Sequence, residues 1–258
     1  MNPLERLNPG YFLESQDAAA EVVDFVTIIG ILILSLSIIG LAGYPVLKNA
    51  QEARYIENTK LSFIILAENL NTVALGQAPS KSLELKLYGG SLKVTDESSI
   101  VINATNSTNH EITLVEQDIG NIQNSIGDTV VAYEGTGVWV KYPQDVTLNA
   151  YRPLFTNQSG ALVIPVVEIS GNSSVGGNGL SRIKAEGSPA ISYYNNVSNV
   201  TITIKGNYVG GWKDYFENIN KMGWEMSSGT GNTYTAVLNT DKNIDVYILN
   251  TKIYTEIE

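Results

Sequence analysis

An uncharged apolar stretch near the start of the chain constrains this sequence more than any other feature. It runs from Phe25 to Leu47, FVTIIGILILSLSIIGLAGYPVL. At about 1.5 Å per residue, a helix of this length crosses a hydrocarbon layer of about 30 Å. No second stretch of this kind occurs in the sequence. We therefore expect a single membrane span, with membrane lipid as a partner.

The helical pattern continues beyond the apolar stretch. No glycine or proline lies between Val46 and Leu75, and apolar residues recur there at steps of three and four. The pattern predicts one long helix over residues 19–75, transmembrane at 25–47 and amphipathic afterwards, with a kink at Pro45. Gly76 ends this helix, and residues 76–82 are expected to form a linker.

From Leu83 onward the apolar residues alternate with polar ones, which is typical of strands. A β-hairpin is expected at Gly89–Gly90. One short helix is expected within GWKDYFENINKMGW, residues 211–224, with Gly223 as its cap, and we interpret the aromatic residues on its face as core. The expected fold is α+β: a long N-terminal helix, then an antiparallel β-sandwich-like head over residues 83–258. The remaining strands are predicted at Ser99–Asn103, Glu111–Val115, Thr129–Tyr133, Gly137–Tyr142, Val146–Ala150, Ala161–Ser170, Asn199–Lys205, Thr233–Leu238 and Ile244–Ile257.

Composition and motifs argue against several functional classes. The chain has 26 acidic and 16 basic residues and a net charge of −10, so nucleic acid is not an expected partner. It has no cysteine, which excludes disulfides, thiolate metal sites and cysteine nucleophiles. His110 is the single histidine and has no nucleophile motif nearby, and no calcium-loop motif occurs. The segment Gly171–Gly179 lacks a phosphate-loop pattern and is interpreted as a mobile loop. We expect no enzyme activity, no metal and no cofactor.

Two carboxylates, Glu21 and Asp24, precede the apolar stretch. They either mark the cytoplasmic boundary of the span or pair with cations on neighbouring helices in a bundle of copies. Gly40–Ala42 resembles a signal-peptidase site. A secretory signal also needs a positively charged leader, whereas Arg6 is the one basic residue before the span and is outnumbered by acidic residues.

The orientation of the span is not settled by charge. Lys48, Arg54 and Lys60 follow the span, and by the positive-inside rule they favour a cytoplasmic head. Long domains translocate largely regardless of such charges, so we expect the N-terminus in the cytoplasm and the head outside.

Six N-x-S/T sequons lie downstream of the span, and each is a candidate N-glycosylation site. The alternation of Val200, Ile202 and Ile204 with polar residues predicts that the last of the six points outward. The six asparagines are Asn103, Asn106, Asn157, Asn172, Asn196 and Asn199.

The segments DAAAEVVDFVTIIG, VAYEGTGVWVKY, PVVEISGNSSVGGNG and WKDYFE resemble an uncharacterised family of archaeal type IV pilin-like membrane proteins. In type IV pilins a peptidase removes a short basic leader, and a Glu at the fifth mature position assists assembly. The resemblance implies a leader over residues 1–18. Cleavage before Ala20 places Asp24 fifth, and cleavage before Asp17 places Glu21 fifth. The leader here departs from the pilin pattern, because it contains no Lys-Gly or Arg-Gly pair.

The expected function is that of a pilin-like, membrane-anchored cell-surface protein with a structural, adhesive or minor-pilin role. Its N-terminal helix anchors the protein or packs with copies of itself or other pilin-like subunits. Two alternatives stay open: a single-pass surface binding protein that does not polymerise, and an extracellular carboxylate-dependent hydrolase.

Overall fold

The computed structural model describes residues 10–219, 222–239 and 243–258. The chain divides into two compact units, Met1–Ala53 and Arg54–Glu258, and the first helix contributes to both. This helix, α1, spans Gly10–Ala74, so it begins inside the segment predicted as a leader. Pro45 lies within α1 and does not end it. The kink at Pro45 stays a prediction.

The C-terminal end of α1 has the cap that its sequence predicts. Gly76 adopts a φ of +72°, and its N–H donates to the carbonyl of Val73 at 3.0 Å. The N–H of Gln77 reaches back to the carbonyl of Thr72 at 2.9 Å. A Cβ atom on Gly76 would lie 2.7 Å from Cγ of Pro189. Glycine is therefore required here both by backbone conformation and by packing.

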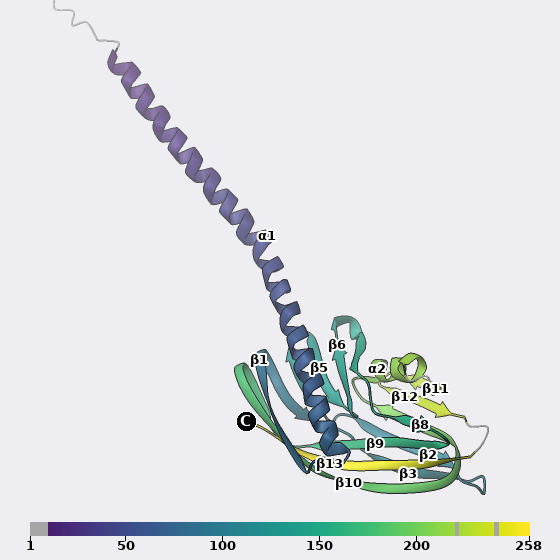
Figure 1. Ribbon diagram of the computed structural model, residues 1–258. Coiled ribbons are helices and arrows are strands. Elements are labelled where there is room, and N and C mark those ends of the chain that lie inside the picture. The colour runs from purple at the N-terminus through teal and green to yellow at the C-terminus, as the bar shows by residue number, and fades with distance from the viewer. Residues whose placement is uncertain (1–9, 220–221, 240–242) are drawn as a thin grey trace, which may run out of the picture. The chain divides into compact units, whose positions relative to one another are not determined.

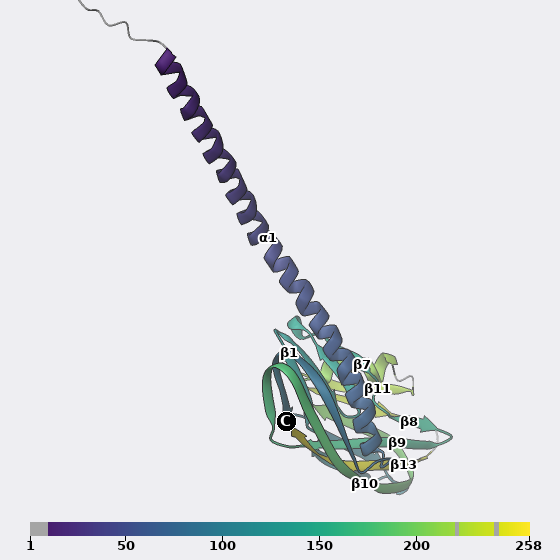
Figure 2. The ribbon, with the colours of Figure 1, turned by 60° about the vertical axis from the view of Figure 1, so that its left-hand side comes forward.

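The larger sheet, sheet A, has the strand order β7-β6-β5-β4-β1-β10-β13-β9-β8 (Figures 1 and 2). Neighbouring strands are antiparallel except β13 and β9, which are parallel. The predicted antiparallel sheet is thus confirmed with one exception. The bounds are β1 Ser80–Thr95, β4 Asn121–Ile126, β5 Thr129–Glu134, β6 Gly137–Lys141, β7 Thr147–Tyr151, β8 Thr156–Gln158, β9 Ala161–Ser170, β10 Ser174–Lys205 and β13 Ile244–Ile257.

The smaller sheet, sheet B, contains the end of β10 between two pairs of strands. Strands β2 and β12 flank β10, β3 pairs with β2, and β11 pairs with β12. Because β10 pairs with β1 and β13 first and with β2 and β12 later, this one strand belongs to both sheets. The bounds are β2 Ser99–Thr105, β3 Glu111–Asp118, β11 Trp224–Thr230 and β12 Thr233–Leu238.

Sheet A packs against other elements on part of each face, and this arrangement makes two hydrophobic cores. One core lies between sheets A and B and includes Ile102, Ile164 and Ile202. The other forms where the last three turns of α1 pack on the opposite face of sheet A. Its α1 residues are Phe63, Leu66, Ala67, Leu70, Val73 and Ala74. The part of α1 in the second unit is therefore an integral layer of the head.

The predicted short helix is confirmed as α2, Val209–Asp214, followed by a π-helical turn at Tyr215–Ile219. Trp212, Tyr215 and Phe216 are buried and close one end of the core between the sheets. The ring centroids of Trp212 and Trp139 lie 4.7 Å apart. This confirms the interpretation of the aromatic residues as core. A short 3₁₀ turn, Pro143–Asp145, joins β6 to β7.

Two local predictions are wrong. The hairpin expected at Gly89–Gly90 is a β-bulge within the single strand β1, because residues on both sides of it pair with β10. The segment Gly171–Gly179, interpreted as a mobile loop, forms the start of β10 from Ser174. Both errors share a cause: glycine breaks the alternating pattern, while partner strands still supply the backbone hydrogen bonds.

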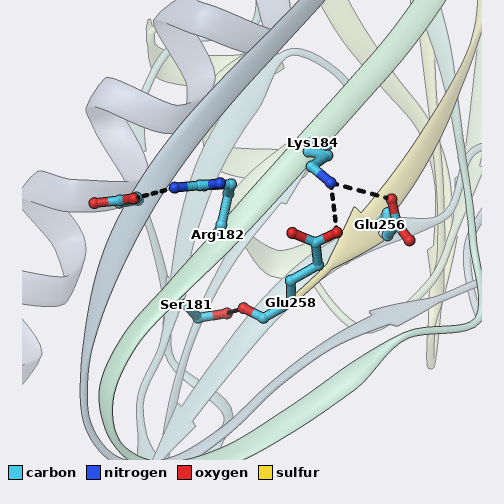
Figure 3. Close-up of polar contacts among 6 residues, drawn as sticks. Ser181, Arg182, Lys184, Glu256 and Glu258 are labelled. Carbon is cyan, nitrogen blue, oxygen red and sulfur yellow. Dashed lines mark hydrogen bonds and ion pairs between the residues drawn. The ribbon is translucent and has the colours of Figure 1, made fainter.

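The C-terminal strand is fixed to β10 by a cluster of polar contacts (Figure 3). The backbones of Arg182 and Glu258 exchange two hydrogen bonds of 2.9 Å. Lys184 forms ion pairs with Glu258 and with Glu256, the latter at 3.8 Å, and the hydroxyl of Ser181 donates to the Glu258 carbonyl. These contacts fix the register of β13 against β10 up to its last residue.

Candidate membrane anchor

The apolar stretch of α1 is exposed along its whole length. Between Val22 and Leu47 the large apolar side chains are exposed by 39% at Ile29 to 79% at Leu41. Ala20–Ala74 is the one helix in the described residues that is long and apolar enough to cross a membrane. An apolar helix exposed on every side is stable in lipid or among other helices, and costly in water.

The serine and threonine hydroxyl groups within this stretch are satisfied inside the helix itself. Thr27 donates to the carbonyl of Val23 at 2.7 Å, and Ser37 donates to that of Ile33 at 2.7 Å. Ser35 makes the same four-residue contact to Ile31 at 2.8 Å. Each hydroxyl therefore enters an apolar environment with its donor already bonded, which lowers the cost of removing it from water.

Charged residues stand at both ends of the stretch. Glu21 and Asp24 are exposed and three positions apart, so they lie on one side of α1. Neither forms an ion pair within the part of the chain that the structure describes. On the other side of the stretch, Lys60 pairs with Glu57 at 2.6 Å. The two predicted assembly carboxylates are thus available to groups outside this chain, and Pro45, the third predicted residue, lies exposed within α1.

The six sequons differ in accessibility. Asn172, Asn196 and Asn199 are exposed, and Asn199 points outward as predicted, because its neighbour Val200 is fully buried. Asn103 and Asn157 are half-buried on strands. Asn106 is half-buried in a turn. Asn172 lies just before β10, and Asn196 and Asn199 lie at two irregular pairings within it.

The histidine and two of the carboxylates of the head that a hydrolase could use have local hydrogen-bond partners. His110 lies in an exposed turn, where its Nδ1 is 3.1 Å from the hydroxyl of Thr108. No group of three or more His, Cys, Asp or Glu side chains in the described ranges is arranged to hold a metal ion. Glu111 accepts a hydrogen bond from Asn103, and Asp214 accepts one from Asn218.

Sequence reasoning missed one ionisable residue, Glu134 at the end of β5. Its carboxyl is fully buried, and burial raises its pKa above the usual value of 4.5. Three donors partly oppose that rise: the hydroxyl of Ser98 at 2.5 Å, the indole N–H of Trp212 at 2.9 Å and the amide of Asn121 at 3.3 Å. These donors come from the β1–β2 connection, α2 and β4, so Glu134 ties together three separate segments. No periodic pattern in the sequence predicts such a group.

Fold and anchor together define a protein with one apolar helix of membrane-spanning length joined to a β-rich head. The chain belongs to DUF7289, a family of unknown function, whose model matches residues 18–256. Neither the curated proteins nor the solved structures gave a match to the chain. The family match covers the candidate anchor and nearly all of the head, and it assigns no activity to either.

Proposed function

We propose that this protein is a pilin-like surface protein anchored in the membrane by a single span, with the N-terminus in the cytoplasm and the head outside. The observation that carries the proposal is the exposure of the apolar side chains from Val22 to Leu47. Lipid or neighbouring helices must cover this surface. The head then serves a structural, adhesive or minor-pilin role through its external contacts.

Lack of cysteine makes the orientation directly testable. A single cysteine replacing Ser107, which is exposed in the turn between β2 and β3, reports on the head. A membrane-impermeant maleimide should label this variant equally in intact and in lysed cells, and the parent chain should show no labelling. Labelling only after lysis would place the head in the cytoplasm, as the positive-inside count favours.

Assembly through the N-terminal helix is the second part of the proposal. An unpaired carboxylate at the edge of the hydrocarbon costs a few kcal/mol, so a cation on a neighbouring helix stabilises a bundle. A cysteine at Ser35 allows disulfide crosslinking between copies within the membrane. We expect Asp24→Asn to abolish the crosslinked species, and Glu52→Gln, a carboxylate beyond the apolar stretch, to retain it.

Several outcomes favour the alternatives. An anchored binding protein that does not polymerise is supported if the chain with cysteine in place of Ser35 gives no crosslinked species. It is also supported if Asp24→Asn and Glu21→Gln both leave the crosslinking unchanged. N-terminal sequencing of the native protein separates pilin-like cleavage, with an end between Asp17 and Ala20, from a plain anchor that keeps Met1. An end at Gly43 would indicate secretion.

No enzyme activity is part of the proposal. The acidic surface, with 26 acidic and 16 basic residues, disfavours nucleic acid as a partner. The hydrolase alternative requires two carboxyl groups across a substrate cleft, and it is tested by screening the full-length protein against polysaccharides.

A further inference from the structure

An apolar part of sheet A lies beyond the end of α1. Strands β9, β10 and β13 run past the C-terminal end of the helix (Figure 1). At the end of the helix, the hydroxyl of Thr251 donates to the carbonyl of Ala74 at 2.7 Å. Leu249 lies two residues before Thr251 in β13, and Tyr247 lies two residues before Leu249, so both are on the face that α1 covers at Thr251.

The neighbouring strands extend this face. Ile191 and Tyr193 of β10 pair with Leu249 and Tyr247, and Tyr247 also pairs with Val163 of β9. Ile191 is 68% exposed and Tyr193 is 53% exposed. We call these five residues the tyrosine face. No described part of the chain covers Ile191 and Tyr193, although their apolar surface favours burial.

The aromatic rings on this face are held in place. The ring centroids of Tyr193 and Tyr247 lie 4.9 Å apart, and the ring planes are tilted by 35° to each other. The hydroxyl of Tyr193 donates to Asp245 at 3.0 Å, and this hydrogen bond is the main cause that raises the pKa of Tyr193. The phenol therefore stays neutral, and a fixed, uncharged ring surface faces outward.

A sequon borders the tyrosine face. The second carboxylate oxygen of Asp245 accepts the backbone N–H of Asn196 at 3.1 Å. Asn196 is exposed at a bulge in β10, with φ at +56°. Asn243 donates to its side-chain oxygen at 3.1 Å. The side-chain nitrogen of Asn196, the atom that would carry a sugar, has no partner in the described residues. The carboxylate of Asp245 therefore binds both Asn196 and Tyr193, so the sequon lies next to the tyrosine face.

We propose that Asn196 carries an N-linked glycan whose first sugars cover the tyrosine face. Pyranose rings have apolar C–H faces that pack on aromatic rings, and their hydroxyls stay in water. The two neighbouring tyrosine rings offer an apolar surface comparable in size to one or two sugar rings. The sequon at its edge favours this occupant over a second protein. The inference rests on the proposed external location of the head.

The modification is a group transfer from a lipid-linked sugar phosphate donor, catalysed by a transferase. The side-chain nitrogen of Asn196 forms a bond to the anomeric carbon, and the bond from that carbon to the phosphate oxygen breaks. The amide loses one proton to a base of the transferase, and the lipid phosphate leaves with the bonding electron pair.

The test uses full-length protein from native membranes. Ser198→Ala removes the sequon and keeps Asn196 with its contacts, whereas Ser174→Ala removes the sequon at Asn172 as a matched control. Mass spectrometry of the peptide containing Asn196 should show a glycan in the parent chain and in Ser174→Ala, and its loss in Ser198→Ala.

Hydroxyl-radical oxidation then reports whether the glycan covers the face. Oxidation of Tyr193 should rise severalfold in Ser198→Ala relative to the parent chain. Tyr254, which is 61% exposed on the opposite face of β13, should not change. A bare Asn196 overturns the proposal, as does equal oxidation of Tyr193 in the two chains. If Asn196 carries no glycan but the cysteine at position 107 is labelled in intact cells, this inference fails and the proposed surface location of the head stands.

Discussion

Glu134 lacks a cation to balance its charge within the described residues, and its burial has a consequence for the pH dependence of folding. Its pKa in the folded state lies above the unfolded value of about 4.5. Between these two values the folded chain binds more protons than the unfolded chain. The contribution of Glu134 to stability is therefore greatest below about pH 4.5, declines as the pH rises toward the folded-state pKa, and is constant above it.

We predict that Glu134→Gln removes this decline, because glutamine cannot ionise. Urea unfolding of the detergent-solubilised full chain at several pH values measures the effect. All three tryptophans are buried in the core between the sheets and report head unfolding by fluorescence. Glu116→Gln, an exposed carboxyl on β3, is the control and should keep the pH dependence of the parent chain. An unchanged decline in Glu134→Gln would show that the carboxyl does not titrate in this range.

Asn71 is a second buried polar residue with a structural role. Its amide donates to the carbonyl of Thr136 at 3.0 Å, and its oxygen accepts the hydroxyl of Tyr133 at 2.9 Å. We predict that Asn71→Ala lowers the free energy of unfolding by about 2–3 kcal/mol, because both partners stay buried and unpaired. Asn69→Ala removes only a contact to Ile65 within α1 and should cost less than about 0.5 kcal/mol. Equal losses in the two variants, measured by urea unfolding, would contradict this role.

At the scale of elements, the packing of α1 on sheet A makes a sharp prediction. Leu66 is 1% exposed in the helix-sheet core, and its neighbour Ile65 is 50% exposed. Leu66→Ala should lower the free energy of unfolding by about 3 kcal/mol through loss of burial and creation of a cavity. Ile65→Ala should change it by less than about 0.5 kcal/mol. Similar values for the two variants would mean that the helix is not docked as the structure has it.

The alternation of apolar and polar residues predicts most strands of the head, and it fails where polar side chains are buried. Strands β9, β12 and β13 match their predicted bounds, since apolar and polar residues alternate along each. Strand β4, NIQNSI, was missed because amide side chains occupy buried positions there. Asn121 bonds to Glu134, and Gln123 accepts the hydroxyl of Tyr208 at 2.6 Å. These partners are distant in sequence, so no window of sequence reveals that the strand is buried.

At the scale of the whole molecule, the two units predict which fragment folds. A chain of Arg54–Glu258 retains every α1 residue of the helix-sheet core, whereas Ser80–Glu258 loses all of them. We predict that the first fragment is a soluble, cooperatively folding protein. The second should aggregate, because one face of sheet A is left uncovered. Gel filtration and thermal unfolding compare them, and a folded second fragment would show that the helix is dispensable to the head.

Sequence alone determined the features that depend on neighbouring residues. An uninterrupted apolar run predicts the exposed helix from Phe25 to Leu47, and alternation predicts the strands, because helix and strand periodicities are local properties. The charges and the sequons are likewise visible directly. Which sequons are exposed is decided by strand pairing, and it follows from sequence only where the alternation is regular, as at Asn199.

Tertiary structure decided what depends on contacts between distant segments. It made the end of α1 a layer of the head, placed β10 in both sheets and paired β9 with β13 in parallel. It also buried Glu134 among donors from three segments and brought Asn196 beside the tyrosine face. The physical reason is that burial and hydrogen-bond partners are set by how the layers stack. A residue's immediate neighbours in the chain do not encode that stacking.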